Sequence, residues 1–219
     1  MNNTSAVRIL LIVFLLFIGC AQPQGTLPEY NQQLSIEEQK IQNQLFADSW
    51  LKTYIDVSEN GLNILFNAVD LCRDEDQIYG IGVDIATRYD GPESIRTELT
   101  KSLLLSDEIT VVATGINTPA RIAGLKNGDK IIKINNVSAP YGIDANSEFY
   151  KIIREAKDKK HKFTINRDGQ DLTIEVGSKN RCRFGFFVDL DNSTFNAFAD
   201  GNYIALSLRM AKWLSQDEI

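Results

Sequence analysis

Residues that could perform chemistry are scarce in this chain of 219 residues, which holds one histidine and three cysteines. The single imidazole is His161, and its neighbours Lys159, Lys160 and Lys162 predict a surface position in a strand. A zinc-peptidase helix needs two histidines on one face with a glutamate between them, so no such centre can be assembled here. No catalytic serine flanked by glycines accompanies the histidine either. We therefore predict no catalytic residue and no metal ligand in this chain.

The first cysteine, Cys20, ends a segment typical of an exported protein. Arg8 precedes ten apolar residues, which as a helix would cross only about half of a bilayer core. This pattern predicts a signal peptide over residues 1–19. Phe17-Ile18-Gly19-Cys20 resembles the bacterial lipobox, which implies a lipid on the Cys20 sulfur. With Ala21 next, the resemblance implies an anchor in the bacterial cell envelope, in the outer membrane facing the periplasm. The alternative is an ordinary signal peptide with a chance cysteine.

If the protein is exported, its two remaining cysteines are expected to behave differently from cysteines in the cytoplasm. Cys72 and Cys182 would both lie in an oxidising compartment, where thiols pair. A disulfide would join the early helical region to the start of the C-terminal segment, and it would stabilise the chain by roughly 4–5 kcal/mol in the chain-entropy model. The alternative is two separate buried thiols.

After the signal peptide, the sequence predicts a tether followed by a helical region. Residues 20–33 carry proline and glycine among polar residues, which predicts a tether. A helical region over 34–78 follows, with a capping box between Ser35 and Glu38 and a candidate break at Gly61. Apolar residues at helical spacing predict its packing face: Ile41, Leu45, Trp50 or Leu51, Ile55, Leu62, Leu65, Phe66 and Val69.

Beyond residue 78 the pattern changes to short strands with helices between them. Residues 79–86 predict a strand, 92–105 a helix and 109–113 a buried strand. A helix is predicted over 146–157, and a hairpin over 162–176 turns at Asp168-Gly169.

The stretch from Thr118 to Asn136 carries the clearest motif. Its small-residue turn, Ala123-Gly124-Leu125, Gly128-Asp129 and following strand resemble the bacterial PDZ domain, which we place at 79–178. The resemblance implies capture of an extended peptide beside the second helix, with the peptide carboxylate held by backbone N–H groups of a glycine-containing loop. It assigns the following residues to the peptide site: Gly80, Ile81, Gly82, Val83 and Phe149. The alternative is a PDZ fold that packs within the protein and captures no peptide.

The segment over 179–219 resembles the CAAX-prenyl-protease-type (HtpX-like) zinc metallopeptidase family, on the run Asn196-Ala197-Phe198-Ala199-Asp200-Gly201. The resemblance implies that this run is an edge strand that pairs with substrate backbone, and that 179–219 begin a peptidase domain. It also implies a zinc ion in the full-length family, held by an H-E-x-x-H motif that this chain lacks. Ser215 with Glu218 forms a capping box, so we expect a helix to open there and the catalytic motif to follow.

The charge composition limits the classes of molecule that this chain could bind. The formal net charge is −6, and no long basic run occurs, so nucleic acid is excluded as a partner. We expect an α+β chain: a helical region, a PDZ-like β-barrel or sandwich with two helices, and an incomplete zincin-like strand–helix segment. The leading hypothesis is the N-terminal, inactive part of a lipid-anchored envelope zinc metalloendopeptidase acting on protein substrates. The alternative is a non-catalytic PDZ lipoprotein that binds peptides or modulates a protease.

Overall fold

The computed structural model describes residues 32–156, 160–191 and 193–214. The predicted signal peptide, Cys20, most of the tether and the Ser215–Glu218 capping box lie outside the described residues. The chain divides into two units, Met1–Glu38 and Gln39–Ile219. The contacts described below lie within the second unit. None of the described helices is both long enough and apolar enough to cross a bilayer.

A long helix, α2 (Gln32–Asn67), provides the first element of this unit from Gln39 onwards. It is already helical three residues before Ser35, so the predicted capping box does not begin it. The predicted break at Gly61 is also wrong, because the helix runs through this buried glycine, where a side chain would collide with the ring of Phe186. Ile41 and Leu45 are 50% and 58% exposed, so the packing face does not include them.

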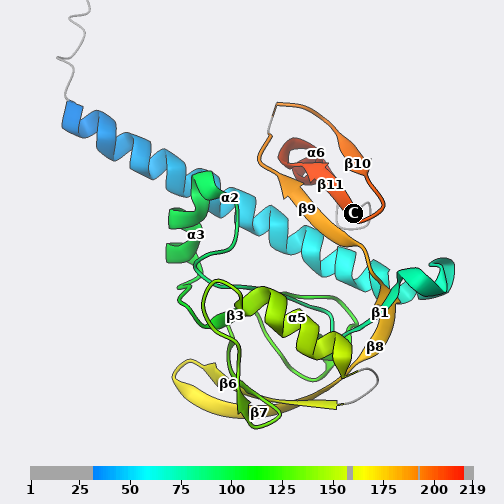
Figure 1. Ribbon diagram of the computed structural model, residues 1–219. Helices are drawn as coiled ribbons and strands as arrows, with labels where there is room; N and C mark the ends of the chain where they lie inside the picture. Colours follow the sequence, from blue (N-terminus) through cyan, green and yellow to red (C-terminus); the bar gives the residue numbers. More distant parts are fainter. Residues whose placement is uncertain (1–31, 157–159, 192, 215–219) are drawn as a thin grey trace, which may run out of the picture. The chain divides into compact units, whose positions relative to one another are not determined.

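An antiparallel sheet of six strands follows, in the order β2-β3-β4-β6-β7 with β5 paired to β4 (Figure 1). The strands are β2 (Val83–Ala86), β3 (Ile109–Thr114), β4 (Lys130–Ile134), β5 (Val137–Ser138), β6 (Lys160–Arg167) and β7 (Gln170–Gly177). Helices α4 (Pro119–Ile122) and α5 (Ala145–Glu155) accompany it. The predicted hairpin is confirmed, since β6 and β7 are joined at Asp168-Gly169, both with positive φ.

The six-stranded sheet and its helices enclose a core of their own. Phe149 and Ile153 of α5 pack against Phe163 and Ile165 of β6, and all four side chains are at most 2% exposed. Alternate residues of β6 point into this core, as expected for a half-buried strand.

A second core forms between α2, a helical insertion and the C-terminal segment. The insertion is the 3₁₀ turn η3 (Glu93–Ile95) and helix α3 (Arg96–Ser102), where a single helix was predicted to reach Leu105. The C-terminal segment contains β9 (Gly185–Asp189), β10 (Ala197–Ala199), β11 (Tyr203–Ser207) and α6 (Leu208–Trp213). Figure 1 shows α2 running between the six-stranded sheet and this segment. Buried side chains from all three parts meet there: Ala47, Trp50, Val57, Ile95, Leu99, Val188, Leu206, Leu208 and Ala211.

Two short strands join the helical region to the C-terminal segment. β1 (Gln77–Gly80) pairs with β8 (Lys179–Cys182) after the 3₁₀ turns η1 (Val69–Leu71) and η2 (Asp74–Asp76). The prediction of one strand over 79–86 is wrong, because Gly82 adopts a φ of +81° and turns the chain from one sheet into the other. This turn creates the loop on which the candidate site is built.

Candidate peptide-binding site

The turn from β1 into β2 contains four of the five residues predicted to bind peptide: Gly80 ends β1, Ile81 and Gly82 form the loop, and Val83 begins β2. Gly82 must be glycine, because its φ of +81° is rarely adopted by other residues and a Cβ there would collide with Thr118. The Thr118 hydroxyl donates to the carbonyl of Gly82 at 3.1 Å, which fixes the loop from below. The structure therefore brings these four predicted residues together on one rigid turn.

Both carbonyl groups of the loop are engaged by the domain, whereas its N–H groups are not. The Ala120 N–H donates to Ile81 O at 2.8 Å, and the Gly115 N–H donates to Gly82 O at 2.9 Å. Among the described residues, none accepts a hydrogen bond from the N–H of Ile81 or of Gly82. Successive N–H groups left over in a turn form a binding place for an anion. The loop is therefore suited to hold a carboxylate.

Strand β2 is an edge strand of the six-stranded sheet, and side chains cover its free edge. The Tyr150 hydroxyl of α5 donates to Val83 O at 3.2 Å, and the Asn146 amide donates to Ile85 O at 3.1 Å. The Ile85 N–H donates to the Asp84 carboxylate at 3.0 Å. Polar side chains thus occupy the positions that an added strand would take on this edge.

Asp84 is the centre of a hydrogen-bonded cluster between α2, α5 and β2. Its carboxylate accepts from the hydroxyl of Tyr54, from Ser58 at 3.1 Å and from Tyr150 at 3.5 Å. Burial raises the pKa of Asp84, and the hydroxyl donors of Tyr54 and Ser58 oppose this shift. Burial and the neighbouring Asp84 raise the pKa of Tyr54 and Tyr150 well above the ordinary value. Both phenols therefore stay protonated and act as donors.

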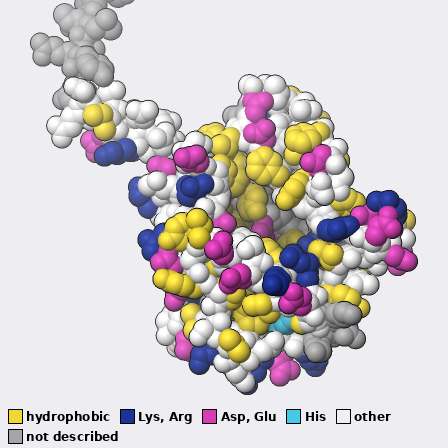
Figure 2. Space-filling model, in the orientation of Figure 1, with side chains coloured by type: hydrophobic (Ala, Val, Ile, Leu, Met, Phe, Trp, Pro, Cys, Tyr) yellow, Lys and Arg dark blue, Asp and Glu magenta, His cyan; other side chains and the backbone are white. Residues whose placement is uncertain are grey.

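The Tyr54–Asp84 contact lies where two larger cavities meet, and both residues line each of them. One cavity, of about 610 Å³, extends over Val83 and Tyr150 towards the C-terminal sheet. The other, of about 420 Å³, extends over Ala86 towards α3. A space of about 20 Å³ lies against the loop itself, where Leu62 of α2 covers it. Figure 2 shows a hollow on this face, with hydrophobic side chains above it and Lys and Arg side chains beside it.

The fifth predicted peptide-binding residue, Phe149, does not line this site. Its side chain has no exposed surface and packs inside the sheet core, with ring centroids 5.4 Å from Tyr150 and 6.2 Å from Phe163. Its neighbour Tyr150 faces the groove instead, one residue further around the helix. Tyr150 was not predicted from the sequence, although its spacing of four from Asn146 places both residues on one helix face.

The predicted substrate-edge run, Asn196 to Gly201, lies far along the chain from the loop and forms β10 and its turn. All three residues of β10 are exposed, and β10 is the outer strand of the three-stranded sheet β10-β11-β9. Asp200 closes the turn, accepting from the N–H of Asn202 and Tyr203 at 2.8 Å each, and these N–H groups lower its pKa. No strand in the described part of the chain pairs with the outer edge of this run.

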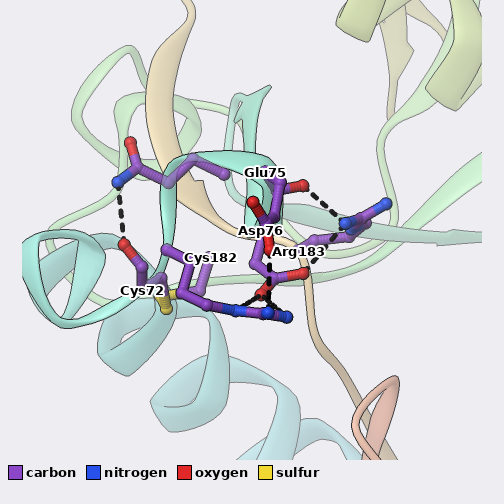
Figure 3. Close-up of polar contacts among 7 residues, drawn as sticks. Cys72, Glu75, Asp76, Cys182 and Arg183 are labelled. Carbon is purple, nitrogen blue, oxygen red and sulfur yellow. Dashed lines mark hydrogen bonds and ion pairs between the residues drawn. A yellow bond between two sulfur atoms is a disulfide. The ribbon is translucent and has the colours of Figure 1, made fainter.

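Cys72 and Cys182 form a disulfide with a Cα–Cα distance of 5.9 Å, and it lies beside β1 and β8 (Figure 3). Arg183 donates to Asp76 at 2.9 Å next to the disulfide, and Arg73 approaches the same carboxylate at 2.7 Å. The two guanidinium groups lower the pKa of Asp76. The junction between the helical region and the C-terminal segment is thus held covalently and by ion pairs.

His161 is not the surface residue that the sequence predicted. It has no exposed surface, and its ring nitrogen Nε2 lies 3.0 Å from the Ser178 hydroxyl. The flanking Lys160 and Lys162 are exposed because they occupy the opposite phase of β6. Burial lowers the pKa of His161. No group of three or more His, Cys, Asp or Glu residues suited to a metal ion occurs in the described part of the chain.

A comparison with known protein families gave a match in the middle of the chain. The PDZ domain family matches residues 80–177. No curated protein matches the chain.

Solved structures similar to this chain include one isolated PDZ domain and two proteases. The HtrA3 PDZ domain bound to a phage-derived ligand (FGRWV) is 20% identical, with a TM-score of 0.37 and coverage of 48% of this chain and 88% of that chain. The HtrA-type protease AlgW with decapeptide is 24% identical, with a TM-score of 0.37 and coverage of 48% and 30%. The photosystem II D1 C-terminal processing protease is 18% identical, with a TM-score of 0.36 and coverage of 52% and 26%. The matched region thus spans less than a third of either protease.

The family match, the glycine loop and the antiparallel sheet with α5 beside its edge all concern the same residues. Residues 80–177 of this chain form a PDZ domain.

Proposed function

We propose that this chain is a peptide-binding protein whose PDZ domain holds the C-terminal carboxylate of a partner at the N–H groups of Ile81 and Gly82. The single observation that carries the proposal is that the domain engages both loop carbonyls and leaves both N–H groups without an acceptor among the described residues. A carboxylate is the group that satisfies two adjacent N–H donors best. The rest of the peptide then lies along β2 as an added strand.

Binding requires side chains to leave the edge of β2. A peptide strand would replace the Tyr150 hydroxyl at Val83 O and the Asn146 amide at Ile85 O, exchanging one hydrogen bond for another. Such an exchange changes the free energy by about 1 kcal/mol or less per bond. We therefore expect micromolar affinity, with the carboxylate contributing much of the discrimination.

The test measures binding of C-terminal peptides to the full 219-residue chain by fluorescence anisotropy, starting from a library with free carboxylates. The tightest peptide is then compared with its C-terminal amide. We expect the amide to bind about tenfold more weakly, because charge-assisted hydrogen bonds to the loop are lost. Equal binding of acid and amide would refute the proposal. The amide resonances of Ile81 and Gly82 should shift most in a ¹⁵N spectrum on addition of the acid.

A second candidate function rests on β10. The run from Asn196 to Gly201 resembles the substrate-binding edge of HtpX-like zinc metallopeptidases, and its β10 strand is an exposed edge. The chain would then be the N-terminal part of a lipid-anchored envelope endopeptidase, with zinc bound by an H-E-x-x-H motif outside these residues. The coding DNA beyond codon 219 decides this, because the peptidase requires that motif within about ten codons. A stop codon there would leave a non-catalytic PDZ protein that binds peptides or modulates a protease.

The lipid on Cys20 and a location in the outer membrane belong to both candidates. Labelling of cells with a fatty acid analogue should mark the chain and should fail to mark a Cys20→Ser variant. Labelling of that variant to the same extent would refute the anchor.

A further inference from the structure

The cavity of about 610 Å³ above the loop is unusually rich in guanidinium groups. Arg154, Arg181 and Arg183 line it, whereas Asp84 is the only carboxylate in its lining. Asp84 already accepts hydrogen bonds from Tyr54, Ser58 and Tyr150. Arg183 is paired with Asp76 at 2.9 Å. Two of the three cations therefore face the cavity with no ion pair to any described residue.

Arg181 is the more constrained of these two. It is only partly exposed, and its Nη1 donates to the carbonyls of Cys182 at 2.9 Å and Phe184 at 3.2 Å. These contacts orient the guanidinium, which forms no direct ion pair with a described residue, and Asp84 acts on its charge only from a distance. Its Nε lies over Gly80, at 2.8 Å from the position that a Cβ of this glycine would take. The Arg181 guanidinium thus lies directly beside the loop whose N–H groups would hold the peptide carboxylate.

Arg154 approaches the same end of the groove from α5. It is one helical turn beyond Tyr150, whose hydroxyl contacts Val83 at the start of β2. The Arg154 side chain is exposed, and no described residue forms a hydrogen bond or an ion pair with its guanidinium group. Arg154 and Arg181 also line the small space against the loop, together with Gly80, Ile81 and Gly82. Both cations therefore stand where the last residues of a bound peptide would lie.

Arg181 is partly buried and has no ion pair to a described residue, and a charge in that situation is costly. The exposed Arg154 adds a second positive charge to the same space, so the two cations together indicate an anionic ligand. The terminal carboxylate of a peptide would take the two loop N–H groups, which leaves the guanidinium groups for another negative charge. Guanidinium groups bind carboxylates through paired hydrogen bonds. We propose that the PDZ domain selects partners with an aspartate or glutamate among their last three residues, through Arg154 and Arg181. This inference rests on the proposed peptide-binding function.

The experiment compares matched peptides that carry Glu or Gln at each of the last three positions, all with a free C-terminal carboxylate. Affinities for the full 219-residue chain are measured by fluorescence anisotropy at low and at high salt. We expect at least one Glu peptide to bind about tenfold more tightly than its Gln counterpart. The preference should shrink as salt increases, because partly exposed charges are screened.

Variants identify the residues responsible. Arg154→Gln removes an exposed side chain without a described partner, so we expect it to fold normally and to lose most of the preference while keeping the affinity for the Gln peptide. Arg181→Lys keeps the charge but not the paired geometry and should lose part of the preference. Lys151→Gln is the matched control, since it removes an equal charge from an exposed position of the same helix that does not line the cavity.

The outcomes separate this inference from the function on which it rests. Loss of the preference in Arg154→Gln but not in Lys151→Gln supports it. Peptides that bind with a free carboxylate but show no difference between Glu and Gln would overturn the inference and leave the peptide-binding function intact. Binding that ignores the free carboxylate would overturn the function itself, and the inference with it.

Discussion

The PDZ domain and the C-terminal sheet of β9, β10 and β11 obtain their cores in different ways. The PDZ domain buries Phe149, Phe163 and Ile165 against one another within a single stretch of chain. The C-terminal sheet buries Val188 and Leu206 only by packing on Trp50 of α2 and on the α3 insertion. The first region has a core built from its own residues, and the second depends on segments that are far away in the sequence.

The helical insertion between β2 and β3 contributes to the second core. Ile95 and Leu99 lie within the PDZ match, yet they pack into the second core rather than into the sheet core. The same helix α2 that completes the second core also places Tyr54 and Ser58 against Asp84 of β2. Stability of the C-terminal sheet and access to the PDZ groove therefore depend on one helix.

The largest effect is expected where the two regions are covalently joined. Cys72 and Cys182 are 110 residues apart, so their disulfide removes much of the entropy of the unfolded chain. Replacing both by serine should lower the free energy of unfolding by about 4–5 kcal/mol, measured by urea denaturation. Reductant should have no further effect on the double variant. Unchanged stability in that variant would show that the disulfide does not constrain the folded protein.

Trp50→Ala tests whether the C-terminal sheet depends on α2. The Trp50 ring is 4% exposed, and its N–H donates to Val188 O at 3.1 Å. We expect a loss of about 3 kcal/mol, with faster hydrogen exchange in β9 and β11 and little change in β4 and β6. Faster exchange of equal size in both sheets would contradict the separation into two cores.

Tyr54→Phe tests whether α2 restricts the groove. The substitution removes the hydroxyl that binds Asp84 and keeps the ring stacked on Trp50 at 4.9 Å. We expect peptide affinity to increase about fivefold, because Asp84, once released from Tyr54, can more easily leave the Ile85 N–H free for a peptide strand. Tyr203→Phe, in the same cavity but without a described hydrogen bond from its hydroxyl, is the control. Weaker binding by Tyr54→Phe would show that the hydroxyl assists binding.

The smallest effect concerns His161, which is buried in the sheet core. Because burial lowers its pKa below the value of about 6.5 in an unfolded chain, the unfolded state binds more protons as the pH falls. The contribution to stability is complete above about pH 6.5 and is lost as the pH decreases through the lowered pKa. His161→Asn should flatten this part of the pH dependence of unfolding. A variant with the same slope as the wild type would exclude His161 as its source.

Local signals predicted the fold of the PDZ domain well, because its turns are encoded by adjacent residues. Asp168-Gly169 specified the hairpin, and Gly82 with Val83 marked the loop. The packing face of α2 was predicted poorly, since its buried residues include Ala47, Ser58 and Gly61, which hydrophobic spacing does not detect. His161 was assigned to the wrong side of β6, although its alternation with Phe163 and Ile165 carried the information.

The groove itself could not be predicted from the sequence. Asp84 meets Tyr54 and Tyr150 across 30 and 66 residues, and Arg181 reaches the loop only because β8 pairs with β1. Contacts of this kind depend on tertiary packing and leave no periodic pattern. The loop was predicted because its glycines lie close together in the sequence. The side chains that surround the loop were not predicted, because they come from distant parts of the sequence.

The most direct test of peptide capture is the affinity of one C-terminal peptide measured as the free acid and as the amide. If the N–H groups of Ile81 and Gly82 hold the carboxylate, the acid binds about tenfold more tightly. Equal affinities for the two forms would contradict the account.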